Sequence, residues 1–252
     1  MISLHTLTQT LDDWMRPNEF KDYAPNGWQV EGRSEIGRLA LGVTASLDVI
    51  EQAKAWNADA LLVHHGYFWR NEPVTLTGMK GRRVRELVMA NMSLLAYHLP
   101  LDCHLEFGNN VTLLQTLGLD DRQPVPNESG LLWEAKLPES MSLAALGHRV
   151  EAALNRPPLL VEAPEGASTL HRLVVCTGGA QDYLAKAAAI GADVYLSGEI
   201  SERTTHEARE LGVHYVAAGH HATERYGVQA LGRKVADFLG VEVAFFDDHN
   251  PA

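Results

Sequence analysis

"LALGVTASLDVIEQAKAWNADALLVHHG", residues 39–66, decides the fold because a later stretch of the chain repeats its order. That later stretch is "LVVCTGGAQDYLAKAAAIGADVYLSGEI", residues 173–200. At a constant offset of 134 positions, Asp59 aligns with Asp193. Each copy has the pattern of a strand, a turn of small residues, an amphipathic helix and a second strand. The sequence therefore predicts a duplicated α/β unit.

A second helix and strand are expected after each copy, in residues 84–102 and 206–221. Strands that alternate with helices are typical of parallel sheets covered by helices. The proline-rich and polar stretch 118–130 is expected to be a linker or a long loop. We therefore predict two similar α/β domains, residues 1–125 and 126–252, which could exchange their terminal segments. Further helices are expected near the N-terminus and in 142–155 and 224–240, with strands in 157–163 and 241–247.

Charge and composition exclude several classes of protein. The formal net charge is −11, which disfavours binding to nucleic acid and to anionic membranes. The basic stretch 80–85 is expected to be a solvated helix face, although it could meet one anionic ligand. No apolar run is long enough to span a membrane. Cys103 and Cys176 are the only cysteines, so no disulfide framework is expected and a cytoplasmic location is predicted.

Polar side chains gather where the predicted strands end, which is where ligands bind in parallel α/β sheets. His64 and His65 end one strand, Asp102 follows the next, and His220 and Glu224 follow the corresponding strand of the second copy. Each feature has a simpler explanation: a histidine doublet can split between core and surface, a loop aspartate can form a turn, and a carboxylate can stabilise a helix start. Their coincidence favours a binuclear metal centre, because carboxylates bridge cations and imidazoles complete the coordination.

Neighbouring residues receive secondary roles. His98, His206 and His221 could orient ligands from outside the coordination sphere. Glu199 aligns with His65 and could accept a proton, whereas Cys103 is interpreted as a small buried residue. A bend at Gly66 would let both histidines of the doublet face one site. The "TGGAQ" stretch, residues 177–181, lacks a nucleotide-binding pattern and is interpreted as a turn between strand and helix.

The motifs "DYAPNGWQVEG", "GVTAS", "VHHGYFW", "HLPLDCH", "FGNN", "SGEISE" and "AGHHATERYG" together resemble the YbgI-like proteins of the Nif-three-like family, which carry the name GTP cyclohydrolase 1 type 2 homolog. The resemblance covers nearly the whole chain. It implies two intertwined three-layer α/β/α domains, a ring-shaped homohexamer and a two-metal site. The metal ligands that it implies are His64, His65, Asp102, His220 and Glu224.

The leading hypothesis is a metal-dependent hydrolase with two divalent cations per chain, which could be Fe, Zn, Mn, Co or Ni. Asp102 and Glu224 are possible bridging ligands, and hydroxide would attack a nucleotide-like substrate, as the family name implies. The alternative is a non-catalytic protein that stores or delivers metal or binds a regulatory partner. A third interpretation makes the cations structural.

Overall fold

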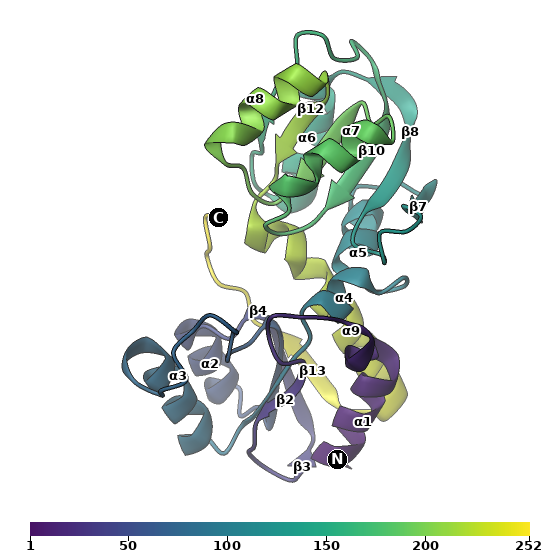
Figure 1. The fold of residues 1–252 in the computed structure, drawn as a ribbon. Helices are drawn as coiled ribbons and strands as arrows, with labels where there is room; N and C mark the ends of the chain where they lie inside the picture. Colours follow the sequence, from purple (N-terminus) through teal and green to yellow (C-terminus); the bar gives the residue numbers. More distant parts are fainter. The chain divides into compact units, whose positions relative to one another are not determined.

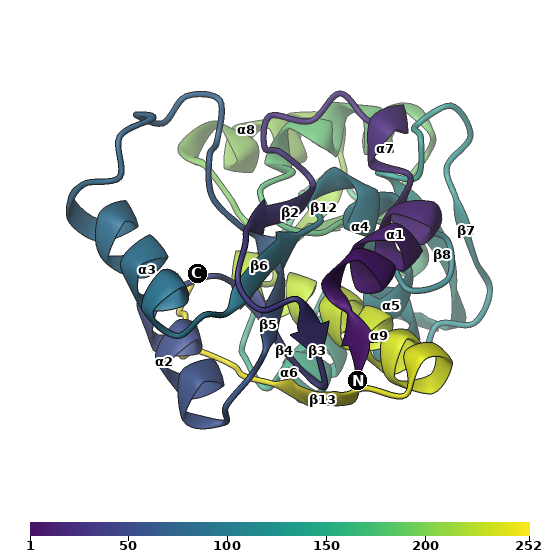
Figure 2. The same ribbon diagram turned by 90° about the horizontal axis from the view of Figure 1, so that it is seen from below.

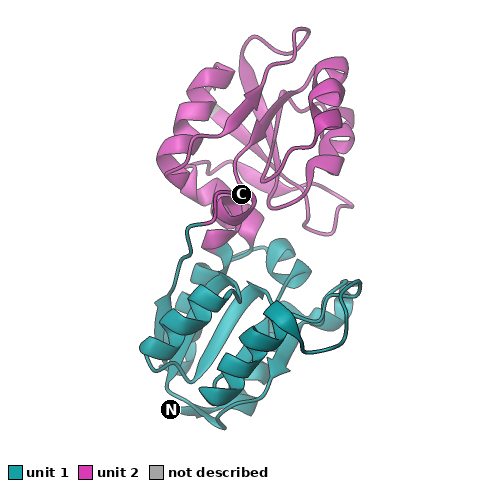
Figure 3. Ribbon diagram, turned by 90° about the vertical axis from the view of Figure 1, so that its left-hand side faces the viewer, with its two compact units in different colours: residues 1–108, 227–249 teal, residues 109–226, 250–252 magenta. Residues whose placement is uncertain are grey.

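The computed structural model describes residues 1–252, apart from the side chain of Pro138. Its contacts divide the chain into two compact units (Figure 3). Unit 1 contains Met1–Gly108 and Gly227–His249, and unit 2 contains Asn109–Tyr226 and Asn250–Ala252. The predicted limits, 1–125 and 126–252, followed the linear order of the chain. The contacts assign the late segment Gly227–His249 to unit 1, an exchange of a terminal segment that the sequence interpretation had left open.

Unit 1 is built on a sheet in the order β13-β4-β5-β6-β2. Strands β13, β4, β5 and β6 run parallel, and β2 joins β6 antiparallel. The bounds are β1 (Ile2–Ser3), α1 (Leu4–Met15), a 3-10 turn (Pro17–Glu19), β2 (Gly27–Val30), β3 (Glu35–Ile36), β4 (Arg38–Thr44), α2 (Leu47–Ala55), β5 (Ala60–His65), α3 (Gly78–Met89), β6 (Ser93–Ala96), α4 (Leu99–Cys103) and β13 (Glu242–Phe245). The two short strands β1 and β3 pair with each other.

Helices cover both faces of this sheet because its strands are apolar on both faces. Leu39 and Leu41 of β4 pack with α1 and the second part of α9, whereas Ala40 between them packs with α2 and α3. Figures 1 and 2 show these two helix pairs on opposite sides of the sheet. Ser46 starts α2, since its side chain accepts a hydrogen bond from the Val49 N–H.

The late segment belongs to unit 1 for two physical reasons. The second part of α9 buries Val228, Leu231 and Val235 in the unit 1 core. The β13 strand then pairs with β4 along four residues and closes that edge of the sheet. A strand was expected in 241–247. Its pairing partner β4 lies far earlier in the chain, so no local pattern in the sequence indicates which strand it pairs with.

Unit 2 has the sheet order β7-β8-β10-β11-β12-β9, with parallel strands β10, β11 and β12 at its centre and antiparallel pairs toward both edges. The bounds are α5 (Asn109–Thr116), β7 (Arg122–Pro124), β8 (Trp133–Met141), α6 (Leu143–Leu154), β9 (Leu159–Val161), β10 (Leu170–Cys176), a 3-10 turn (Gln181–Tyr183), α7 (Leu184–Ala189), β11 (Val194–Ser197), α8 (Glu202–Leu211), β12 (His214–Ala217) and α9 (His220–Leu239).

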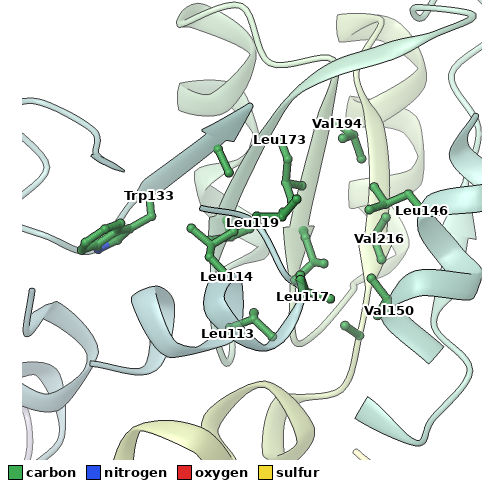
Figure 4. Packing of buried hydrophobic residues seen from close by; sticks show 14 of the residues in the cluster. Leu113, Leu114, Leu117, Leu119, Trp133, Leu146, Val150, Leu173, Val194 and Val216 are labelled. Carbon is green, nitrogen blue, oxygen red and sulfur yellow. The ribbon is translucent and has the colours of Figure 1, made fainter. Parts of the chain in front are cut away.

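The unit 2 sheet also packs on both faces. Leu146 and Val150 of α6 and Leu114 of α5 meet inward residues of the strands, such as Leu173 (Figure 4). Helices α7 and α8 cover the other face. The expected linker 118–130 was wrong in part, since β7 lies within it and pairs with β8. Its prolines are compatible with that position because β7 is an edge strand.

The two sheets share a set of hydrogen bonds at the offset of 134. Asp59 Oδ2 accepts from two successive backbone N–H groups of unit 1, and Asp193 Oδ2 does so in unit 2. The donors are Gly37 and Arg38 for Asp59, and His171 and Arg172 for Asp193. The preceding turns also agree, with φ of 59° at Asn57 and 78° at Gly191. These shared contacts support the predicted duplication.

The predicted class, mixed α/β with mostly parallel sheets, is confirmed. Helices were correctly expected in 142–155 and 224–240, although α9 begins earlier, at His220. Among the helices of the described residues, none combines the length and the apolar character needed to cross a bilayer.

Candidate metal centre

His64 and His65 lie at the carboxyl end of β5, a central strand of the unit 1 sheet. The strand remains regular as far as His65, which pairs with Thr44 of β4. The two ring centroids are nevertheless 4.4 Å apart, so the bend expected at Gly66 is not needed to bring the rings together. Gly66 has another role, because a Cβ there would lie 2.3 Å from Gln29 Oε1.

His64 is fully buried, and its surroundings fix its tautomer. Its Nδ1 lies 3.0 Å from the carbonyl oxygen of Tyr97, which can only accept a hydrogen bond. The Nδ1 atom therefore carries the proton, and in the neutral ring Nε2 carries the lone pair. That Nε2 lies 3.5 Å from Asp102 Oδ1. A ring nitrogen lone pair and a carboxylate oxygen thus face each other across a short gap.

Two more imidazoles adjoin His64. One ring nitrogen from each of His64, His65 and His98 lies within 4.8 Å of the others, as is needed to hold one cation. His65 Nδ1 is 3.1 Å from the Thr44 hydroxyl, which gives that ring a fixed neighbour. His98, expected to orient ligands, donates from Nδ1 to Asp22 Oδ1 at 2.9 Å when the carboxyl is ionised.

Asp102 lies in the short helix α4, so the expected loop was wrong. Pro100 stands within the first turn of α4, where it leaves no helical hydrogen bond unmade. The Asp102 residue is only 7% exposed, and water therefore screens its charge little. Burial, followed by the charges of Asp102 and Asp22, raises the pKa of the Cys103 thiol well above its ordinary value. Cys103 is thus a small buried residue, as predicted. We call His64, His65 and Asp102 the unit 1 half-site.

In unit 2, α9 begins at His220, so His220 and Glu224 are one helical turn apart. His220 Nε2 lies 3.2 Å from Glu224 Oε2, and His220 Nδ1 lies 2.7 Å from Glu199 Oε1. Burial alone would lower the pKa of His220, but Glu224 and then Glu199 outweigh it and raise the pKa to about 9. We call His220 and Glu224 the unit 2 half-site.

Gly178, in the turn after β10, lies so close to this half-site that a side chain there would have no room. Its φ is +68°, and a Cβ there would lie 2.1 Å from Glu224 Oε1. Its N–H donates to Thr223 Oγ1, and its carbonyl accepts from the Gly198 N–H. The turn was predicted from its sequence. Its contact with the Glu224 carboxylate was not.

The residues given secondary roles have different outcomes. Glu199 lies at His220, as its alignment with His65 suggested. His206 does not serve a site, because its side chain is 63% exposed on α8 and pairs with Glu202 one turn away. His221 is buried, and its backbone N–H donates to the Ala252 carbonyl.

Sequence reasoning missed Asp22. Its side chain is 3% exposed and accepts hydrogen bonds from His98 Nδ1 and from the backbone N–H groups of Tyr23 and Leu99. Burial would raise its pKa, but the hydrogen bonds from His98 and Asn26 and the His98 charge lower it well below the usual range. Its place in "KDYAPNG" is typical of a turn aspartate, so the available signal was ambiguous.

The donors in both units fit a divalent transition metal. They are imidazole nitrogens and carboxylate oxygens, and each candidate histidine has a partner at Nδ1. Such partners fix the ring orientation of metal-binding histidines and make Nε2 a better ligand. The clusters can therefore hold metal.

Comparisons with known proteins identify the family. The profile of the family described as Duf34/NIF3 (NGG1p interacting factor 3) matches residues 2–251. A GTP cyclohydrolase 1 type 2 homolog of Allochromatium vinosum is 50% identical over 252 residues, which cover 100% of this chain and 98% of that protein. A protein of the same name from Vibrio cholerae is 47% identical over 246 residues, with 97% and 98% covered.

Solved structures extend the likeness to the whole fold. The protein named ybgI has a TM-score of 0.95 and 39% identity, and TTHA1606 from Thermus thermophilus has a TM-score of 0.91 and 30% identity. Each comparison covers 100% of both chains. The chain belongs to the Duf34/NIF3 (NGG1p interacting factor 3) family, as its motifs predicted.

Proposed function

We propose that this protein is a metal-dependent hydrolase, and that its two half-sites bind the same pair of divalent cations. The ligands in this proposal are His64, His65 and Asp102 from unit 1 and His220 and Glu224 from unit 2. The observation that carries it recurs in both units: a histidine with a fixed Nδ1 partner turns Nε2 toward a carboxylate oxygen.

Such a pair of atoms requires a positive charge between them. Two lone pairs at 3.5 Å or 3.2 Å repel each other in a site with little water. A proton on Nε2 would remove the repulsion, and in the absence of metal it does so at His220, whose pKa is raised to about 9. A divalent cation satisfies both atoms and carries more charge. We therefore regard the proton as a substitute for the metal.

Two cations fit the donor set better than one. Three imidazoles and two carboxylates are too many for one tetrahedral ion with an open position for water. Carboxylates can bridge two ions, and Asp102 and Glu224 are the proposed bridges. Mixed nitrogen and oxygen ligands suit iron, zinc, manganese, cobalt or nickel.

Divalent cations bound there would act as Lewis acids and lower the pKa of water. The chain's own contribution is orientation and proton handling. Glu199 Oε1 accepts the proton of His220 Nδ1, and this fixes the ring with Nε2 toward Glu224, where the two residues would hold a cation. The Glu199 side chain is 44% exposed, so it can also exchange a proton with water. A nucleotide-like substrate is proposed from the name shared by the relatives.

The test combines metal content with turnover. The metal-replete chain is expected to contain two ions and to hydrolyse at least one nucleotide in a screen that includes GTP. Asp102→Asn is expected to lose metal and turnover together. His206→Ala is the matched control, because that histidine lies exposed on α8, and it is expected to keep both.

Tight metal binding without turnover of any nucleotide would contradict the hydrolase and favour the non-catalytic metal scaffold. Full metal content in Asp102→Asn would instead contradict the ligand assignment. The ring-shaped homohexamer and the cytoplasmic location stay predictions, and sedimentation of the purified chain tests the first of them.

A further inference from the structure

Two loops of unit 1 place aromatic rings beside the histidines of the half-site. Tyr23 lies in the loop before β2, and Trp69 lies in the loop after β5. Their ring centroids are 6.0 Å apart, and each lies about 5 Å from the His98 ring, at 5.1 Å for Tyr23 and 5.0 Å for Trp69. We call Tyr23, Trp69 and His98 the aromatic cluster.

The cluster adjoins the candidate metal ligands directly. The Trp69 centroid is 5.9 Å from that of His65, and the His98 centroid is 5.1 Å from that of His64. A flat molecule stacked on Trp69 would therefore bring its edge toward the metal-binding imidazoles. Tyr23 is nevertheless 52% exposed, and Trp69 is half-buried, so water reaches this aromatic surface.

The loops that carry the rings are tied together. The Arg70 N–H donates to the Tyr23 carbonyl at 2.8 Å, and the Arg70 guanidinium donates to the Asp22 carbonyl at 2.8 Å. The Asp22 carboxylate accepts from the Tyr23 N–H and from His98 Nδ1. The Asp22 carboxylate thus holds the Tyr23 backbone and the His98 ring, and Arg70, the residue after Trp69, ties the Trp69 loop to the Tyr23 loop.

Backbone strain also marks the Trp69 loop. Phe68 has a φ of 67°, which is unfavourable for a side chain of this size. The preceding Gly66 approaches Gln29 closely, and Gln29 Oε1 accepts from the Tyr67 N–H at 2.7 Å. The fold thus holds Trp69 in position despite the unfavourable backbone at its neighbour, and such positions cluster where ligands bind.

We infer that the aromatic cluster is a stacking surface for a planar heteroaromatic ring of the substrate, such as a purine base. Aromatic faces stack on any nucleobase, and a surface already held in place loses little entropy on binding. The inference rests on the proposed function, since it names the part of a nucleotide-like substrate that unit 1 recognises.

The test uses calorimetry on the full, metal-replete chain with three probes: GTP, guanosine and inorganic triphosphate. GTP and guanosine are expected to bind. In Trp69→Leu and in Tyr23→Leu, the affinity for both should fall about tenfold or more, the usual worth of stacking on one ring. Triphosphate binding should not change in either variant, because triphosphate has no ring to stack.

Two further variants control for damage to the fold. Trp69→Phe keeps an aromatic face and should recover much of the affinity that Trp69→Leu loses. Phe238→Leu removes an aromatic ring that is 65% exposed on the last turn of α9, and it should bind all probes as the unaltered chain does. Both loops are held by backbone contacts, so metal content should be normal in every variant.

Several results would overturn the inference. The first is that neither GTP nor guanosine binds. The second is that Trp69→Leu binds them as tightly as the unaltered chain does. The third is that Trp69→Leu loses as much affinity for triphosphate as for guanosine. A change of oligomeric state in Tyr23→Leu without loss of guanosine binding would make the cluster a contact between copies, and would also overturn it. Failure of the proposed function looks different, because guanosine would still bind while no nucleotide is hydrolysed.

Discussion

Gly178→Ala tests the shape of the unit 2 half-site, and the chain contains a matched control. Gly178 and Gly118 both have φ of +68°, a conformation that costs a non-glycine residue about 1–2 kcal/mol. A Cβ at Gly118 meets nothing within 4 Å, whereas a Cβ at Gly178 would lie 2.1 Å from Glu224 Oε1. A Cβ at Gly178 would also lie 3.2 Å from His220 Nε2, so the difference between the two variants measures the contact with the half-site, in which the Glu224 carboxylate is the nearest group.

The size of the displacement follows from the contact. Real Cβ atoms essentially never approach closer than 3.0 Å, so Glu224 Oε1 must retreat by about 0.9 Å. The Gly178 backbone cannot easily move instead, since its N–H and carbonyl are both hydrogen-bonded. Metal–ligand distances tolerate only about 0.2 Å of change. We therefore expect Gly178→Ala to weaken metal binding about 100-fold or more.

The assay is competition with a chromogenic chelator, together with thermal unfolding of the metal-free chain. Gly118→Ala should lower the melting temperature by about 2–8 °C, which corresponds to 1–2 kcal/mol in a protein of this size, and should keep its metal affinity. Gly178→Ala should show at least the same fall and lose metal affinity as well. If Gly178→Ala bound metal as tightly as Gly118→Ala, Glu224 would not be a ligand.

Three further predictions concern pH and the shared hydrogen bonds. Because His220 with its pKa of about 9 must lose a proton to bind metal, metal affinity should rise about tenfold per pH unit from pH 7 to 9 and then level off; the same affinity at pH 7 and 9 would argue against His220 as a ligand. Asp59→Ala and Asp193→Ala should each lower the free energy of unfolding by about 2–4 kcal/mol in urea denaturation, because each leaves two backbone N–H groups without their acceptor; a large loss in only one variant would count against equivalent roles. Because folding lowers the pKa of Asp22, its ionised carboxylate stabilises the folded chain at pH values above the ordinary pKa of 3.8, and this stability is lost as the pH falls below 3.8. The free energy of unfolding of Asp22→Asn should therefore fall less on acidification than that of the unaltered chain. Identical pH dependences in the two proteins would refute this.

The sequence was sufficient for the features that depend on local pattern. Alternation of apolar strands and amphipathic helices indicated the α/β class, and the repeat of Asp59 at Asp193 has a structural reason in the backbone hydrogen bonds that each accepts. A helix was expected in 224–240, and α9 begins one turn earlier, at His220, which gives His220 and Glu224 the helical spacing that their separation suggested.

The sequence was insufficient where distant segments meet. The pairing of β13 with β4 depends on an open sheet edge that no local pattern reveals. Asp22 acts through His98, which lies 76 residues away, and an aspartate near proline and glycine looks like an ordinary turn residue. His206 was wrongly expected to assist the site because its helix follows a site strand, although the side chain points to water.

We propose that Asp102 and Glu224 bind the same ions, and a double-mutant cycle on metal affinity tests this proposal most directly. Asp102→Asn, Glu224→Gln and the double variant would be compared with the unaltered chain by chelator competition. Because ligands of one centre are energetically coupled, we expect the double variant to bind metal at least tenfold more tightly than the two separate losses would predict, a coupling of about 1.4 kcal/mol. Losses that add to within about 0.5 kcal/mol would instead show that each unit binds its own metal independently.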